Sequence, residues 1–190
     1  RRNGPFIILN GALLDVKKYE QELFGEERND GSILYGALEK ATGGLLLIDE
    51  VSEIPLETQS KILRVLTDQK FKRINGNHDI KVDVRIICSS AKDIKMEINN
   101  GNFREDLFHR LNVIPLNIPP LRERKNDIEL LINHFNKRIS RKYNFTEKKF
   151  SKEAVELLKD QKWSGNVREL KNIIERILIM LPDEQIDKSG

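Results

Sequence analysis

The sequence predicts an α/β fold, a parallel sheet with helices on both faces, followed by a small α-helical part. Short continuous apolar runs alternate with helical patterns, as in a parallel sheet that is covered on both faces. The Pro119-Pro120 pair ends this alternation, because proline continues neither a strand ladder nor a helix. All later segments have helical spacing. We therefore expect an α/β core over residues 1–119 and a helical subdomain over residues 120–190.

Four apolar runs are predicted to be strands of this sheet. They cover residues 6–9, 45–48, 84–89 and 113–118. A helix is predicted to follow Pro55, because apolar residues then recur at helical spacing and proline suits a helix start.

Three helices are predicted in the second part. Asn126 with Glu129, and Asn166 with Glu169, have the spacing of a capping box, and Ser151 is placed to begin the shorter helix between them. Apolar residues recur three and four positions apart after each start, which predicts one buried stripe per helix.

The composition fits a cytoplasmic protein with a heavily charged surface. The 190 residues include 33 basic and 30 acidic side chains, and a net charge of +3 does not by itself predict nucleic-acid binding. Cys88 is the only cysteine, so a disulfide within the chain is excluded. No apolar run approaches the roughly 20 residues of a membrane span, and no signal peptide is recognisable. Because the chain begins at Arg1 without Met, we expect it to be a fragment.

Asp49 and Glu50 directly follow the second apolar run. In phosphate-handling proteins, the first acid of such a pair holds Mg²⁺ and the second orients a water for attack on a γ-phosphate. The glycine-rich phosphate loop that normally accompanies these acids does not precede them here, so the chain carries half of a nucleotide site. The alternative is an acidic turn at a strand end.

Two other polar residues are weaker candidates for the same site. Asn10 ends the first predicted strand and would reach the acids if the two strands are adjacent. The alternative is a simple turn, which Gly11 supports. Arg168 follows Asn166 in the first turn of the last helix, where the helix dipole disfavours a cation. That position hints at an anionic partner, whereas the alternative is a solvent-facing side chain.

Arg104 and Arg110 lie six residues apart in a short amphipathic segment. The planar guanidinium suits bidentate contact with phosphate oxygens. Surface pairing with Glu105 and Asp106 is the alternative, and it is favoured when the segment is considered alone.

Taken together, these segments resemble the central AAA+ ATPase domain of bacterial enhancer-binding transcription activators, a domain of the P-loop NTPase type. That family includes response regulators that work with sigma-54. The resemblance covers essentially the whole chain, and six motifs occur in the family's order. They are FIILN at 6–10, ELFG at 22–25, GGLLLIDE at 43–50, FREDLFHRLNV at 103–113, PPLRER at 119–124 and WSGNVREL at 163–170.

The resemblance assigns a role to each candidate residue. It implies ATP and Mg²⁺ as ligands, with Asp49 and Glu50 as the Walker B pair: Mg²⁺ support and catalytic base. Asn10 matches the residue that pairs with the glutamate and switches it between nucleotide states. The other matches are Ser90 with the sensor I position, Arg104 and Arg110 with arginine fingers that reach a neighbouring subunit's γ-phosphate, and Arg168 with the sensor II arginine of the lid.

The sequence departs from the family pattern in three places. The Walker A loop, with its strand and helix, is expected just before Arg1. Sensor I usually reads Thr-Asn, whereas this chain has Ser90-Ala91 and lacks the carboxamide. The loop that carries Gly-Ala-Phe-Thr-Gly-Ala and contacts sigma-54 is replaced by the shorter segment 26–39, which lacks the aromatic-Thr tip. This shortened form resembles the NtrX branch, response regulators paired with NtrY-type sensor kinases.

The resemblance implies a ring-type homo-oligomer within a regulator that has a phosphoreceiver domain before this part and a DNA-binding domain after it. We expect an NtrY-like sensor kinase, promoter DNA and RNA polymerase as partners of the whole regulator, and transcription control without remodelling of sigma-54. A degenerate, non-hydrolysing oligomerisation module is the alternative, favoured by Ala91. Another AAA+ machine, such as a clamp loader, fits less well because of the motifs at 121–124 and 166–170.

Overall fold

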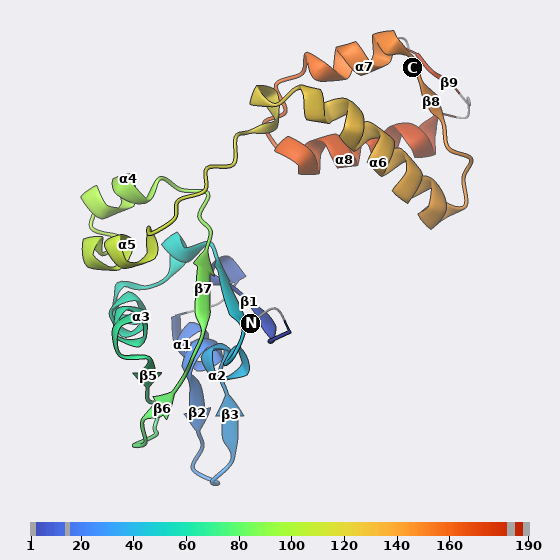
Figure 1. The fold of residues 1–190 in the computed structure, drawn as a ribbon. Coiled ribbons are helices and arrows are strands. Elements are labelled where there is room, and N and C mark those ends of the chain that lie inside the picture. The colour runs from blue at the N-terminus through green and yellow to red at the C-terminus, as the bar shows by residue number, and fades with distance from the viewer. Residues whose placement is uncertain (1–2, 14–15, 182–184, 188–190) are drawn as a thin grey trace. The chain divides into compact units, whose positions relative to one another are not determined.

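The computed structural model describes residues 3–13, 16–181 and 185–187. It contains two compact units, Arg1–Pro115 and Leu116–Gly190 (Figure 1). Each unit has its own hydrophobic cluster, and we describe each unit separately. No helix among the described residues is long and apolar enough to cross a membrane.

The first unit is built on a three-stranded parallel sheet in the order β1-β4-β7. The predicted strands at 6–9, 45–48 and 84–89 are confirmed, and so is the α/β class. The register pairs Asn10 with Asp49, which places two predicted site residues at the same carboxyl edge of the sheet. The strands are β1 Phe6–Asn10, β4 Leu45–Asp49 and β7 Arg85–Cys88.

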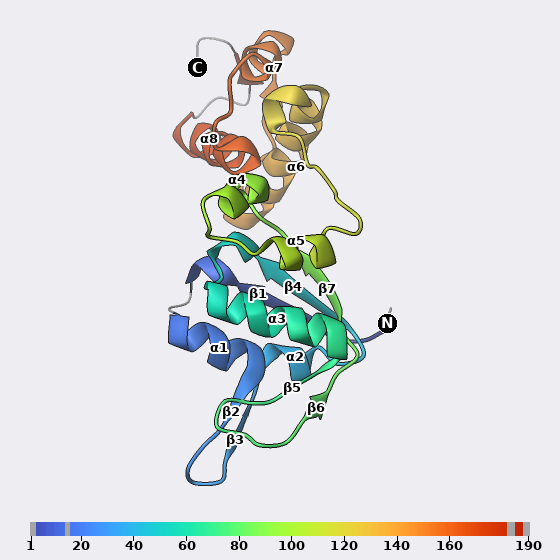
Figure 2. The ribbon, with the colours of Figure 1, turned by 90° about the vertical axis from the view of Figure 1, so that its left-hand side faces the viewer.

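The two faces of this sheet are buried to different degrees. Side chains alternate between the faces of a strand, and Leu46 and Ile48 are fully buried against the helices α1 Val16–Phe24, α2 Ala37–Lys40 and α3 Leu56–Asp68. These helices lie on one side of the strands (Figure 2). Large apolar side chains on the opposite face are exposed: Phe6 (56%), Ile8 (59%) and Ile87 (45%).

The prediction of a fourth strand over residues 113–118 is wrong for this structure. No strand is formed there, and the apolar side chains are strongly exposed, up to 86% for Leu116. A strand needs a neighbour whose backbone groups pair with its own. Within the described residues, β7 pairs with β4 and with no other strand, so the segment 113–118 is not paired with the outer edge of β7.

Two antiparallel hairpins and several short helices complete the first unit. The β2–β3 hairpin has its tip at residues 28–32, and α5 packs against α3. These elements are η1 Gly11–Leu13, β2 Gly25–Glu27, β3 Ile33–Tyr35, η2 Val51–Glu53, β5 Lys70–Phe71, β6 Ile80–Lys81, α4 Ile94–Asn99 and α5 Glu105–Leu111.

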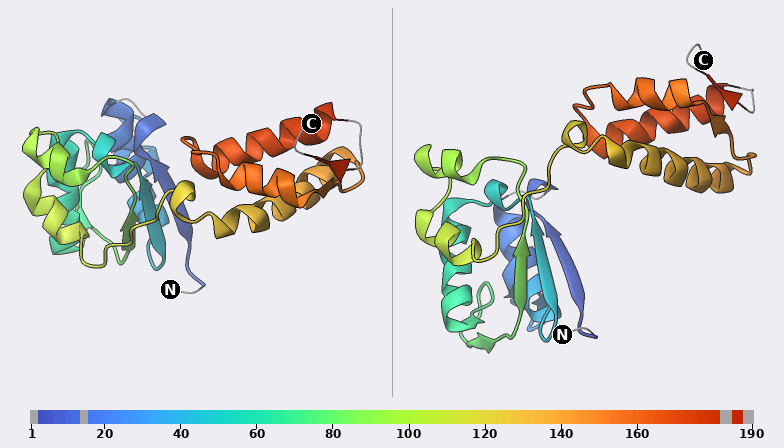
Figure 3. Two further views of the ribbon diagram at one scale, coloured as in Figure 1. Left: turned by 90° about the horizontal axis from the view of Figure 1, so that it is seen from above. Right: turned by 45° about the horizontal axis from the view of Figure 1, so that its top comes forward.

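The second unit is a helical bundle in which α6 packs against α7 and α8 (Figure 3). Its core is formed by apolar side chains from all three helices and by the buried Trp163, whose indole N–H donates to the Leu158 carbonyl at 2.7 Å. The elements are η3 Leu121–Glu123, α6 Asn126–Tyr143, β8 Lys149–Phe150, α7 Lys152–Lys159, α8 Asn166–Met180 and β9 Gln185–Ile186.

The predicted helix starts hold to different extents. The Ser151 hydroxyl caps α7 by accepting a hydrogen bond from the Ala154 amide at 3.2 Å. The capping box at Asn126 is wrong, because Lys125 is the N-cap of α6 and no side-chain cap bond forms.

The box at Asn166 is displaced by one residue. Gly165 is the N-cap of α8, and its amide donates to Glu169 Oε2 at 2.8 Å. Asn166 has a φ of 53°, a left-handed conformation that asparagine tolerates well, and its Oδ1 accepts from the Leu121 amide at 2.8 Å. Asn166 therefore joins α8 to η3 and does not cap α8.

Candidate active site

The two acids lie at the carboxyl edge of the parallel sheet, where ligands bind in open α/β sheets. Asp49 ends β4 and is half-buried beside Asn10 on β1. On its other side, the Ser89 hydroxyl donates a hydrogen bond to Asp49 Oδ1. Sequence reasoning missed Ser89, although it directly follows β7 and so had to meet the same edge.

Glu50 has a strained backbone. Its φ and ψ are both 55°, a left-handed conformation that costs a residue with a Cβ about 1–2 kcal/mol. The turn is held from β7, because the Val51 amide donates to the Ser89 carbonyl at 2.9 Å and Glu50 Oε2 accepts from the Ala91 amide at 3.0 Å. Gly11 packs beneath it, where a Cβ would lie 2.6 Å from the Glu50 carbonyl oxygen.

Asn10 and Glu50 make separate hydrogen bonds in this structure. Asn10 Oδ1 accepts from the Ala12 amide at 3.0 Å, which is an Asx-type turn, while Glu50 is held by Ala91. Asn10 thus forms the turn that was the alternative prediction. The strand register also places Asn10 beside Asp49.

Ser90 braces the turn that follows β7. Its hydroxyl donates to Ser52 Oγ at 3.1 Å and accepts from the Lys92 amide at 3.1 Å. Ala91 contributes no polar side chain, yet its amide is the group that holds Glu50. A backbone amide therefore contacts the second acid at Ala91, the position that the resemblance matches to the sensor I carboxamide.

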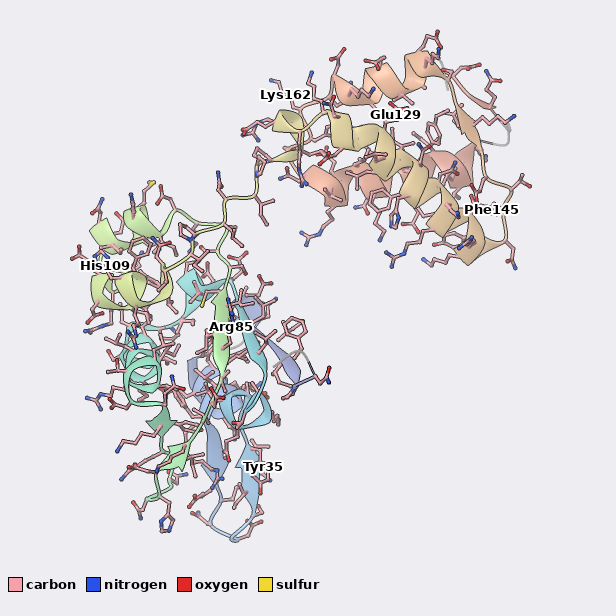
Figure 4. The ribbon with its side chains drawn as sticks, in the orientation of Figure 1. Tyr35, Arg85, His109, Glu129, Phe145 and Lys162 are labelled. Atoms are coloured by element: carbon pink, nitrogen blue, oxygen red, sulfur yellow. The ribbon has the colours of Figure 1, made fainter. Side chains whose placement is uncertain are left out.

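The two predicted finger arginines are exposed and lie at opposite ends of α5. Arg104 is the N-cap residue, and its guanidinium makes a two-point ion pair with Asp106, with the shorter distance 2.6 Å. The Asp106 carboxylate raises the pKa of Arg104, and Arg104 holds the pKa of Asp106 below its usual range. Arg110 donates to the Leu66 carbonyl at 3.0 Å, which ties α5 to the end of α3. Figure 4 labels His109, the residue that precedes Arg110 in the sequence, on this helix.

Gln59 on α3 bonds to the segment that contains Arg104, and the sequence patterns did not single it out. Its side chain is fully buried, and it bonds to the loop before α5 that contains Arg104. The signal was a polar residue within the buried stripe of α3, which also contains Ile62 and Val65.

The segment 26–39, expected to replace the sigma-54 contact loop, forms the β2–β3 hairpin and α2. Its tip closes within five residues, with the Arg28 amide donating to the Ser32 carbonyl at 2.9 Å. Below the tip, Arg73 is almost buried and pairs with Glu39 at 2.7 Å and Glu27 at 3.0 Å. Its guanidinium also lies 5.4 Å from the centre of the Tyr35 ring, which Figure 4 labels on β3. The hairpin is thus short and anchored.

Arg168 belongs to the second unit. It is exposed in the first turn of α8, as the sequence predicted. Its position relative to Asp49 is not defined, because the two residues lie in different units.

The donor set at the sheet edge suits a hard cation that is shared with a ligand. Asp49 offers carboxylate oxygens and Asn10 a carboxamide oxygen, the ligand types that Mg²⁺ prefers. No group of three or more His, Cys, Asp or Glu side chains within the described residues is placed to hold a metal. One carboxylate and one carboxamide supply too few ligands for an octahedral ion, so these residues would fit a Mg²⁺ that also binds phosphate oxygens, which is the usual arrangement in nucleotide sites.

Comparison with known proteins identifies the family of the chain. The family model "Sigma-54 interaction domain" matches residues 1–117, and "AAA+ ATPase lid domain" matches residues 122–189. The nitrogen assimilation regulatory protein NtrX of Azorhizobium caulinodans is 43% identical over 100% of this chain and 42% of its own length. The regulatory protein AtoC of Escherichia coli is 45% identical over 95% of this chain and 40% of its own length.

Solved structures agree with the sequence comparisons. NtrX from Brucella abortus in complex with ATP superposes with a TM-score of 0.90 at 45% identity, covering 98% of this chain and 44% of that one. The same protein in complex with ADP gives a TM-score of 0.91 at 44% identity, covering 99% of this chain and 43% of that one. The chain thus spans about two fifths of these relatives. On these matches, the chain belongs to the sigma-54 interaction domain family and carries an AAA+ ATPase lid domain after it.

Proposed function

We propose that this chain is the ATP-binding, ring-forming core of an NtrX-like two-component response regulator that controls transcription. The observation that carries the proposal is the carboxyl edge of the sheet, where Asn10 is in register with Asp49 and the Glu50 turn is hydrogen-bonded to the end of β7. Relatives of the same family have been solved with ATP and with ADP.

Each residue at the edge has a distinct role in this proposal. Asp49 holds Mg²⁺ together with the phosphates of ATP, and Glu50 accepts a proton from the attacking water. In one nucleotide state Asn10 hydrogen-bonds to Glu50 and replaces the Ala91 amide as its partner, and in another state Glu50 bonds to the Ala91 amide again. Ser90 and Arg168 contact the nucleotide from the sensor I and lid positions. The bound metal supplies charge neutralisation at the phosphates, while these side chains position the water and move its proton.

Arg104 and Arg110 serve the neighbouring subunit of a homo-oligomeric ring. Their exposure on α5 supports a role outside the chain's own core, and a guanidinium stabilises the charge that develops on a transferring phosphoryl group. In this structure Arg104 is held by Asp106, so it must exchange that carboxylate for phosphate oxygens when a ring forms.

The regulator controls transcription without remodelling sigma-54. The support is the β2–β3 hairpin, because its five-residue tip is closed by hydrogen bonds of its own and lacks an aromatic-Thr pair. A purified regulator that opened sigma-54 promoters would contradict this part of the proposal.

The remaining expectations concern the whole regulator. The lid subdomain begins at residue 120, after the Pro119-Pro120 pair. An NtrY-like sensor kinase, promoter DNA and RNA polymerase are reached through other domains, in the cytoplasm.

Nucleotide turnover by the full-length regulator tests the proposal. We expect Mg²⁺-dependent ATP hydrolysis that falls at least about 100-fold in Glu50→Gln, because the proton acceptor is lost. Arg104→Ala should be equally inactive alone. An equal mixture of the two variants should regain activity, because each supplies what the other lacks.

A second candidate function is a non-hydrolysing oligomerisation module. Ala91 favours it, because this side chain cannot contact a γ-phosphate. Wild-type turnover no higher than that of Glu50→Gln, combined with nucleotide-dependent assembly, would establish this alternative and overturn the ATPase proposal.

A further inference from the structure

Gln59 uses almost all of the hydrogen-bonding capacity of its side chain. Nε2 donates to the Ile54 carbonyl at 2.8 Å and to the Asn102 carbonyl at 3.0 Å. Oε1 accepts from the Arg104 amide at 2.8 Å. The side chain is fully buried. Because the two carbonyls require a donor and the amide requires an acceptor, the orientation of the carboxamide is fixed.

These three bonds join two segments that carry site residues. Ile54 directly follows η2, the turn that begins at Glu50. Asn102 precedes α5, and Arg104 is its N-cap residue. The contacts span more than 40 residues of sequence on the α5 side, so no local turn replaces them.

The carboxamide holds the backbone of Arg104, while the guanidinium of Arg104 pairs with Asp106. The direction of an N-cap side chain is set by the backbone at that residue. α5 has seven residues, and the neighbouring Phe103 is buried in the core, so the loop at 102–104 is fixed from one side by packing and from the other by Gln59.

We propose that Gln59 is a positioning residue for the Arg104 finger, which it holds at a set place relative to the Glu50 turn. Gln59 itself touches neither nucleotide nor metal. This inference rests on the proposed role of Arg104 at the neighbouring subunit's nucleotide. It adds the residue that fixes the position of Arg104. A subunit that loses Gln59 keeps its own acids but offers its neighbour a misplaced arginine.

The first experiment measures amide exchange in the full-length protein without nucleotide. In Gln59→Met, which keeps the length and removes all three bonds, we expect exchange at residues 102–105 to rise at least tenfold. Thr58→Val is the matched control, because Thr58 is the adjacent fully buried polar residue and bonds Glu20 instead. Exchange at 102–105 that is unchanged in Gln59→Met, or raised equally in Thr58→Val, would overturn the proposal.

The second experiment measures whether Gln59→Met lowers ATP turnover at the site of its own subunit or at the site of the neighbouring subunit. Gln59→Met alone should lose at least tenfold in ATP turnover. Mixed equally with Glu50→Gln, it should recover to about a quarter of wild-type turnover, because random mixing gives a Gln59→Met site an intact finger at one interface in four. Mixed with Arg104→Ala, it should stay inactive, because both partners lack a placed finger.

The mixtures separate this inference from the proposed function. Recovery with Arg104→Ala but not with Glu50→Gln would show that Gln59 acts on its own subunit's acids, which refutes the positioning role. If Arg104→Ala and Glu50→Gln fail to complement each other, the trans-acting site itself is wrong. The amide-exchange result then still decides whether Gln59 fixes the loop.

Discussion

At the scale of single residues, the environment of Cys88 makes a prediction about pH. The thiol ends β7 and is partly buried, and burial raises its pKa to about 12 from the ordinary value of 9.0. The folded state therefore keeps a proton that the unfolded state loses first. This contribution to stability is complete below about pH 9 and is lost as the pH rises towards 12.

We expect the free energy of unfolding to fall by up to about 1 kcal/mol for each pH unit above 9 because of this thiol. Urea unfolding at pH 8 and pH 10 measures the effect, and Cys88→Ala is the control. If the two proteins lose stability equally between these pH values, Cys88 is not the cause.

The residues of the site were predictable to different degrees. Asn10 and Asp49 were predictable, because carboxyl ends of parallel strands meet at one edge, and the structure places them in register. Ser89 and Gln59 had a weaker signal, a place after a strand and a place in a buried stripe, and their bonds to Asp49 and Arg104 were not predictable because those partners lie 40 or more positions away. Hydrogen bonds across such separations leave no local pattern in a sequence.

At the scale of elements, the N-cap of α7 offers a direct test. Ser151 caps an eight-residue helix through the Ala154 amide, and Ser151→Ala leaves that amide without its partner. We expect a loss of about 1 kcal/mol. Thermal unfolding followed by circular dichroism measures it. Ser60→Ala is the control, because this hydroxyl bonds back to the Leu56 carbonyl within α3 and caps nothing. Equal shifts for both variants would contradict the capping role.

Strands and helices differed in how well their patterns predicted them. The helices α3, α6, α7 and α8 follow from apolar stripes, since a helix satisfies its backbone hydrogen bonds internally. The run at 113–118 has the residues of a strand but forms none, because a strand also depends on a neighbour. The residues of a segment predict its preference for strand or helix, and hydrogen bonding to a neighbouring strand decides whether a strand forms.

At the scale of the whole molecule, two hydrophobic clusters that share no residue define two stability units. One cluster covers a face of the parallel sheet and includes Leu46, and the other fills the α6–α7–α8 bundle and includes Ile174. The change from apolar runs to helical stripes predicts a boundary at residue 120, because each pattern builds a different kind of core, and the structure divides between Pro115 and Leu116.

The separate clusters predict that a core defect stays within its own unit. Ile174 is fully buried in the bundle, so Ile174→Ala should destabilise that unit by about 2–5 kcal/mol. Hydrogen exchange should then accelerate along α6, α7 and α8, whereas β1, β4 and β7 keep their protection. Leu46→Ala provides the reciprocal control, because it creates the cavity under the sheet instead. Faster exchange in both units from either substitution would mean that the two clusters unfold as one cooperative core. Exchange confined to one unit would allow the lid to open locally while the sheet edge with Asp49 and Glu50 stays formed.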